Sequence, residues 1–127
     1  MSKNHVIVKL DDFTRQFLVT ALWAETDNKT PQGGEPLENN HSLTDFSLDT
    51  LKSLIADCEA FQEQNAADMA GVPAGQAGHD FWLTRNHHGA GFWDGDYPKE
   101  IGKRLTDAAH AFGEVHLYVH RSLVRAD

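Results

Sequence analysis

The stretch from Gly78 to Asp96 constrains the fold more than any other part of the chain. It holds two of the three tryptophans, three of the eight histidines and four glycines. Asn86 favours the positive backbone angles of a tight turn, and aromatic residues such as those on either side are typical of strands. We therefore expect a β-hairpin over residues 78–94, with its turn at Asn86 and His87. Hairpins and loops of this kind often carry the residues that bind a ligand or partner.

The register of this hairpin decides which side chains are available for binding. With a two-residue turn, Phe81, Leu83 and Phe92 face the core, and the opposite face is left for contacts. A longer turn around residues 87–89 would exchange the two faces. The expected binding residues are Trp82, Arg85, His88, Gly91 and Trp93.

Hydrophobic periodicity indicates the other elements. In three segments, apolar residues recur three and four positions apart, which is typical of helices with one buried face. The segment 114–122 alternates instead, so His116, Tyr118 and His120 are expected on the exposed face of a strand whose other face is buried. The predicted elements are a strand at 5–10, helices at 12–26 and 47–69, a helix between Asp96 and Gly113, and the strand at 114–122, with a long loop at 27–42 and a flexible small-residue linker at 70–78.

These elements combine into an α+β fold within a single domain, residues 1–127. About three helices pack on a small antiparallel sheet, which the 78–94 hairpin forms with the C-terminal strand. The buried face of the second helix is expected to consist of Leu48, Leu51, Leu54, Ile55, Cys58 and Phe61. Because Cys58 lies on this face, we expect its thiol to be buried and unreactive.

Charge limits the classes of partner. The chain carries 19 acidic and 11 basic residues, a formal net charge of −8. Binding to nucleic acid through its phosphates needs a basic face, so direct nucleic-acid binding is not expected, whereas an acidic surface suits a basic protein partner. One cysteine cannot form an internal disulfide, and no apolar run is long enough to span a membrane. A cytoplasmic protein without membrane contact is therefore expected.

Four roles compete for the hairpin. Protein–protein interaction is favoured, because Trp and Arg are enriched at binding hot spots, and the partner would be a protein with a basic surface or a second copy in a homodimer. The alternative is a small enzyme or metal-binding protein with a site around His79, His88 and Asp94. The other two roles are stacking of nucleic-acid bases on Trp82 and Trp93 and a purely structural one. No CxxC or HExxH spacing occurs, so no metal or cofactor is predicted.

Three segments carry a family resemblance. FTRQFLVTALWAE at 13–25, PLENNHSLTDFS at 36–47 and AGHDFWLTRNHHGAGFWD at 77–94 resemble small proteins encoded by bacteriophages and prophages. His87 stands where that family usually has glycine. The resemblance implies an accessory protein in the cytoplasm of a bacterial host, and by analogy a non-enzymatic inhibitor of a host defence or nucleic-acid-processing protein. It implies no specific activity.

Overall fold

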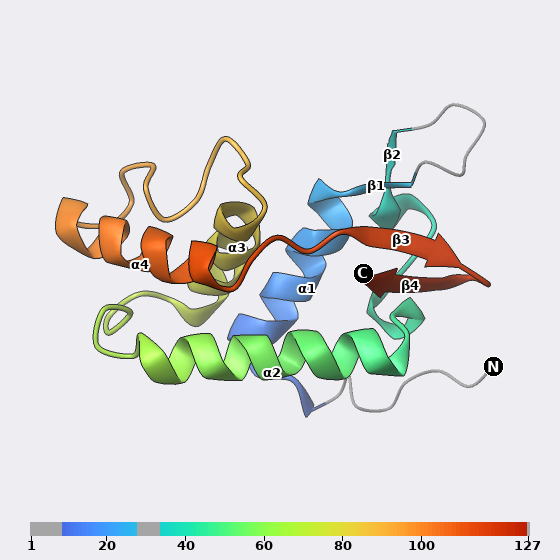
Figure 1. Ribbon diagram of the computed structural model, residues 1–127, viewed down its shortest axis with the longest axis horizontal. Helices are drawn as coiled ribbons and strands as arrows, with labels where there is room; N and C mark the ends of the chain where they lie inside the picture. The colour runs from blue at the N-terminus through green and yellow to red at the C-terminus, as the bar shows by residue number, and fades with distance from the viewer. Residues whose placement is uncertain (1–8, 28–33, 127) are drawn as a thin grey trace.

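The computed structural model describes residues 9–27 and 34–126, apart from the side chain of Asp27 (Figure 1). The α-helices are α1 (Asp12–Ala24), α2 (Leu48–Gln64), α3 (Ala74–Arg85) and α4 (Lys99–Ala111). The strands are β1 (Thr26–Asp27), β2 (Glu35–Pro36), β3 (Leu117–His120) and β4 (Leu123–Ala126). The α+β class is confirmed. None of the described helices is long and apolar enough to cross a membrane. The strand predicted at 5–10 lies mostly outside the described residues.

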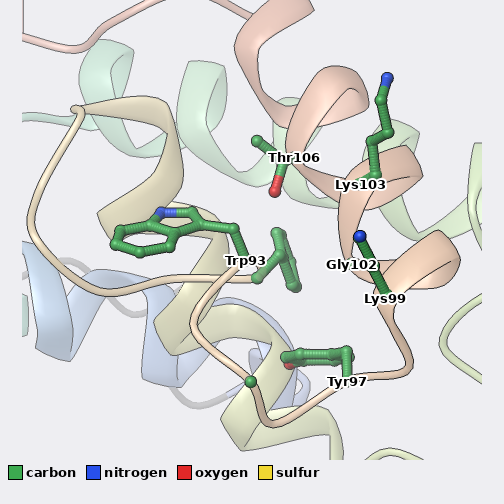
Figure 2. Close-up of a pocket in the computed structure, with 8 residues that line it drawn as sticks. Trp93, Tyr97, Lys99, Gly102, Lys103 and Thr106 are labelled. Carbon is green, nitrogen blue, oxygen red and sulfur yellow. The ribbon is translucent and has the colours of Figure 1, made fainter.

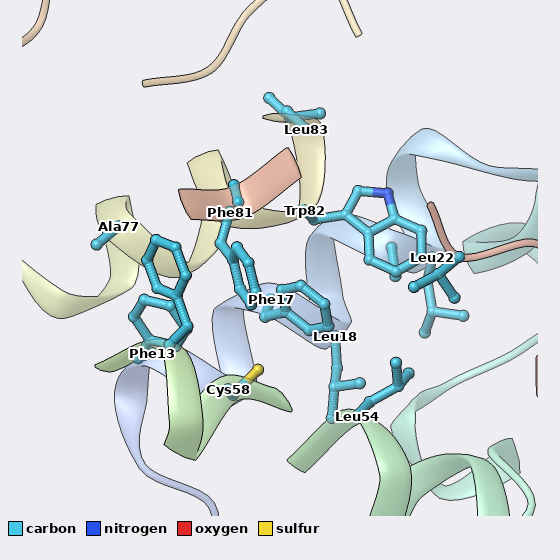
Figure 3. Close-up of a cluster of buried hydrophobic side chains, with 14 of the residues drawn as sticks. Phe13, Phe17, Leu18, Leu22, Leu54, Cys58, Ala77, Phe81, Trp82 and Leu83 are labelled. Carbon is cyan, nitrogen blue, oxygen red and sulfur yellow. The ribbon is translucent and has the colours of Figure 1, made fainter. Parts of the chain in front are cut away.

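The helices surround an aromatic core. Figure 1 shows α2 along one side of the molecule with α1 crossing it, while the β3–β4 hairpin lies at the opposite end from the start of α4. Inside, the ring of Phe61 stacks on that of Phe81 at a centroid distance of 4.1 Å, which joins α2 to α3. Figure 3 shows Phe13 and Phe17 of α1 beside Phe81. Cys58 is fully buried in this core, and burial raises the pKa of its thiol, so the group is unreactive as expected.

The sequence predicts α1 and α2 correctly because both begin at a capping side chain and bury one face. A carboxylate oxygen of Asp11 accepts a hydrogen bond from the Thr14 amide at 2.8 Å, and the Ser47 hydroxyl accepts one from the Thr50 amide. The predicted end of α2 near residue 69 is too late, since the helix stops at Gln64. The prediction that Leu48 lies in the core is also wrong: this side chain is 44% exposed, because the first residue of α2 projects beyond the packed surface.

The predicted 78–94 hairpin is wrong, because residues 74–85 form α3. Residues 74–78 of the predicted flexible linker 70–78 belong to α3, and Gly78 among them allows α3 to pack closely on α1. A Cβ atom at Gly78 would overlap the carbonyl oxygen of Phe13, so only glycine fits this contact. All residues from Phe81 to Arg85 are buried. The part of α3 from residue 80 to residue 85 is buried on every side and has no exposed polar face, so it lacks the periodicity that identifies amphipathic helices.

Asn86 and His87 end this helix rather than turning a hairpin. The His87 amide donates to the Thr84 carbonyl at 3.2 Å, and the His88 amide donates to the Leu83 carbonyl at 3.0 Å. His87 has a φ of +56°, so the two bonds and this left-handed residue form a Schellman cap. An Asn followed by a left-handed residue occurs both in hairpin turns and at helix ends. The Asn86–His87 pair therefore does not distinguish the two structures.

The strands β3 and β4 form an antiparallel hairpin late in the chain. The alternation predicted for the last strand is confirmed, since Leu117 is buried while His116, Tyr118 and His120 are exposed. The sequence does not predict the partner strand β4, because its turn residues Arg121 and Ser122 adopt positive φ angles without being Gly or Asn. A second antiparallel pair joins β1 to β2. The strand β2 lies in the stretch predicted as a loop at 27–42, whereas β1 begins at Thr26, the last residue of the helix predicted at 12–26.

Arg85 joins three helices. Its side chain is 3% exposed, and it donates to the carbonyl oxygens of Phe112 at 3.1 Å and Gly113 at 2.9 Å, just beyond the end of α4. It also forms a 3.0 Å ion pair with Asp57 of α2. The guanidinium lies over the rings of Phe17, Phe81 and Phe112. Its charge is therefore paired and each of its three nitrogen atoms donates a hydrogen bond, which offsets the cost of burying a charge.

Replacing His87 by glycine is expected to stabilise the fold. A left-handed non-glycine residue costs about 1 kcal/mol, whereas the imidazole makes an exposed 3.4 Å ion pair with Glu114 and a ring contact with His110. Surface pairs of this kind contribute little. Urea unfolding of His87→Gly should give an increase of about 0.5–1 kcal/mol. A matched Gly113→Ala variant, at a φ of +81°, should lose stability. Destabilisation by His87→Gly would contradict the helix cap.

Removing the Arg85 guanidinium is expected to destabilise the protein strongly. Arg85→Met keeps the apolar volume but leaves Asp57 and two carbonyl groups without their donor, a loss of about 3–5 kcal/mol. Arg85→Lys should not restore stability, because an ammonium cannot reproduce the planar array of donors. Arg104→Ala is the control, since its pair with Asp68 at 2.7 Å is exposed. Equal unfolding free energies for Arg85→Met and Arg104→Ala would refute this role of Arg85.

Candidate functional site

The loop 86–98 between α3 and α4 presents Trp93 to solvent. Its conformation is set by hydrogen bonds to α3: the Phe92 amide donates to the Thr84 hydroxyl at 3.1 Å, and the Tyr97 hydroxyl donates to Asp80 at 2.7 Å. Phe92 and Tyr97 are buried, whereas Trp93 is 55% exposed. The loop is thus anchored on both sides of an exposed indole.

Gly91 helps to fix the conformation of the loop because it has no side chain and because its backbone amide is hydrogen-bonded. A Cβ atom there would overlap the hydroxyl oxygen of Thr84, the group that accepts the Phe92 amide. Its own amide donates to Asp94 at 3.2 Å, which closes a short turn around Trp93. Gly91 therefore shapes the loop and is itself buried.

A cavity of about 420 Å³ lies between this loop and α4. Figure 2 shows Trp93 and Tyr97 on the loop side of it, with Lys99, Lys103 and Thr106 on α4. The Lys103 ammonium pairs with Asp107 at 3.2 Å, which is consistent with the lysine stems covering apolar surface. The Thr106 hydroxyl is shielded from solvent and makes no hydrogen bond with the described residues. The cavity lining consists of Phe92, Trp93, Gly95, Tyr97, Lys99, Gly102, Lys103 and Thr106.

Asp80 and Tyr97 form a buried polar pair below this cavity. Burial raises the pKa of the Asp80 carboxyl, while the hydrogen bond from Tyr97 and the nearby His79 oppose that rise. Burial also raises the pKa of the Tyr97 phenol, and its bond to Asp80 raises that pKa further. Tyr97 therefore remains protonated and keeps donating to Asp80 at neutral pH.

The raised pKa of Asp80 predicts a pH dependence of stability. Because the folded protein binds this proton more tightly than the unfolded chain, the Asp80 contribution is largest below the unfolded pKa and is lost as pH rises through the folded value. The variant Asp80→Asn cannot titrate. The free energy of unfolding of the wild type minus that of Asp80→Asn should therefore fall between pH 3 and pH 7, measured by urea unfolding. A difference that rises over this range would contradict the raised pKa.

Most of the sequence-predicted binding residues lie inside the protein. Trp82 is fully buried, and Arg85 and Gly91 are also buried, so these three offer no contact surface. The predicted hairpin would have had two alternating faces, whereas residues 80–85 of α3 are all buried. Trp93 and the partly exposed His88 remain accessible.

The structure also separates the three residues of the proposed catalytic or metal site. His79 contacts the Thr20 hydroxyl at 2.8 Å, His88 contacts Glu25 at 2.9 Å, and Asp94 accepts from the Gly91 amide. No hydrogen bond is found between any two of the three residues in the described part of the chain. Across residues 9–27 and 34–126, no group of three or more His, Cys, Asp or Glu side chains is placed to hold a metal ion.

Glu25 is the functional candidate that the sequence did not indicate. One of its carboxylate oxygens contacts both the Trp82 indole nitrogen at 3.0 Å and the His88 Nε2 atom at 2.9 Å. Glu25 follows α1 and lies 63 residues before His88, so no local spacing relates them. His88 also lines a second cavity, of about 410 Å³, whose other lining residues are Trp23, Ala24, Leu83, Gly89 and Ala90.

Comparisons of the chain with protein-family models, curated protein sequences and solved structures gave no significant match. The resemblance to phage-encoded proteins therefore stays a prediction. The two cavities, with Trp93 beside one and His88 beside the other, are the candidate binding sites.

Proposed function

We propose that the protein acts without catalysis, by binding another protein through the surface around Trp93. The observation that supports this most is the exposure of Trp93, 55%, on the rim of an open cavity. Trp is the residue type most enriched at interface hot spots, because burying its large ring against a partner is strongly favourable. The neighbouring cavity can accept an apolar side chain of the partner.

The anchoring of the loop supports this role. Phe92 and Tyr97 are buried on either side of Trp93, and both are tied to α3 by hydrogen bonds. A partner would then meet an indole that is already positioned, so binding would cost little conformational entropy. A mobile tryptophan at a loop tip would lose more freedom on binding.

The charges near Trp93 favour a basic partner. Asp94 and Asp96 lie exposed beside it in the loop, and Glu100 follows in α4. Lys103 and Arg104 are already paired with Asp107 and Asp68. The remaining charges near Trp93 are three carboxylates and one amine, that of Lys99. This local excess of negative charge agrees with the net charge of −8. Together with the phage resemblance, this excess supports a host defence or nucleic-acid-processing protein with a basic surface as the partner.

Affinity capture from bacterial lysate tests this function with matched variants. Trp93→Ala should reduce the affinity for the captured protein by about thirtyfold or more, the loss typical of a hot spot. The control is Tyr118→Ala, which removes another exposed aromatic side chain, on β3. Capture should weaken at high salt if the partner is basic.

Retention of the same protein by wild type and Trp93→Ala, with both variants folded, would contradict the role of this surface. Light scattering tests whether this surface instead binds a second copy of the chain. A wild type that dimerises and a Trp93→Ala variant that stays monomeric would identify a second copy of the chain as the partner.

A further inference from the structure

The cavity at His88 is a second candidate site, formed by different residues from the Trp93 surface. It lies between the end of α1, which supplies Trp23 and Ala24, and residues 88–90 beyond α3. Its volume of about 410 Å³ has room for a single aromatic ring. Trp23 is 53% exposed and provides an aromatic wall, while Gly89 contributes no side chain.

His88 is held in one orientation by Glu25. A carboxylate oxygen accepts hydrogen bonds and cannot donate them, so the His88 Nε2 atom at 2.9 Å carries the hydrogen. The same oxygen accepts from the indole of Trp82, which is fully buried and fixes the carboxylate in turn. Carboxylates commonly fix the tautomer and ring orientation of a functional histidine in this way. The consequence is that Nδ1 of neutral His88 carries a lone pair.

The lone pair defines what the cavity can bind. Nδ1 makes no hydrogen bond with the described residues, so it can accept one from a ligand. The Glu25 carboxylate, 2.9 Å from the His88 ring, disfavours an anion in this cavity. A metal ion would find one nitrogen ligand there and no second ligand among the residues that line the cavity. The remaining lining is apolar or aromatic, apart from backbone groups, so the best complement is a flat ring with one hydroxyl group.

We propose that this cavity binds a phenol, with the aromatic ring against Trp23 and the hydroxyl group donating to Nδ1 of His88. Glu25 acts as a positioning residue, because it contacts His88 but is not itself one of the residues that line the cavity. The ring can belong to a free phenolic compound or to a tyrosine side chain, since the two share this chemistry. The site does not include Trp93, so it stands apart from the proposed protein-binding surface.

Amide chemical-shift titrations with p-cresol and toluene test the hydrogen bond directly. The two probes differ only in the hydroxyl group, and transfer out of water alone would favour toluene. Wild type should bind p-cresol about fivefold to tenfold more tightly than toluene, the effect of one hydrogen bond. His88→Phe keeps a flat ring and should lose this preference. Trp93→Ala should bind both probes as wild type does, which separates this result from the protein-binding proposal.

Two further measurements complete the test. The ¹⁵N shifts of His88 should show the Nε2–H tautomer in wild type and a mixture of tautomers in Glu25→Gln, a change that a purely structural role would not produce. The tripeptide Gly-Tyr-Gly, with Gly-Phe-Gly as its control, distinguishes the sources: tight binding of the tyrosine peptide indicates a side chain, and binding of p-cresol alone indicates a free phenol. Equal affinity for p-cresol and toluene in wild type, an unchanged preference in His88→Phe, or binding of neither probe would overturn the proposal.

Discussion

The buried guanidinium of Arg85 is the interaction on which the rest of the structure depends. It ties the end of α3 to the end of α4 through two carbonyl oxygens and to α2 through Asp57. A second tie is close by, since the Asn86 side chain accepts from the Val115 amide at 2.8 Å. With both helices fixed, the loop between them has fixed ends, and its anchors Phe92 and Tyr97 determine where Trp93 emerges. The buried charge thus helps to fix the two helices that carry the loop of Trp93.

The sequence predicts those elements that have one buried and one exposed face. For α1, α2 and α4 the spacing of apolar residues is sufficient, and for β3 the alternation is sufficient. The spacing of apolar residues fails to predict α3, because residues 80–85 are buried on every side and because Gly78 serves close packing rather than flexibility. The Gly78 contact with the Phe13 backbone is tertiary, so no local rule indicates it. Asn86 and His87 then suggest a hairpin because the left-handed conformation occurs in both contexts.

The residues of the candidate sites can also be predicted only in part from the sequence. Residue type alone selects Trp93 and His88, which the fold leaves accessible, but it also selects Trp82 and Arg85, which the fold buries. Trp82 still contributes, because its indole holds the carboxylate that orients His88. The link from Glu25 to His88 spans two helices and becomes visible only when α1 and α3 lie side by side. Chemistry that depends on such contacts cannot be found from spacing in one sequence.

The central claim is that residues 74–85 form a helix whose residues 80–85 are buried, which places Trp82 inside and leaves Trp93 and Trp23 at the surface. Hydroxyl-radical footprinting with mass spectrometry measures the solvent accessibility of each tryptophan in the native protein. The structure predicts rapid oxidation of Trp23 and Trp93 and strong protection of Trp82. Oxidation of Trp82 at the same rate as Trp93 would contradict the buried helix and favour a hairpin with both indoles exposed.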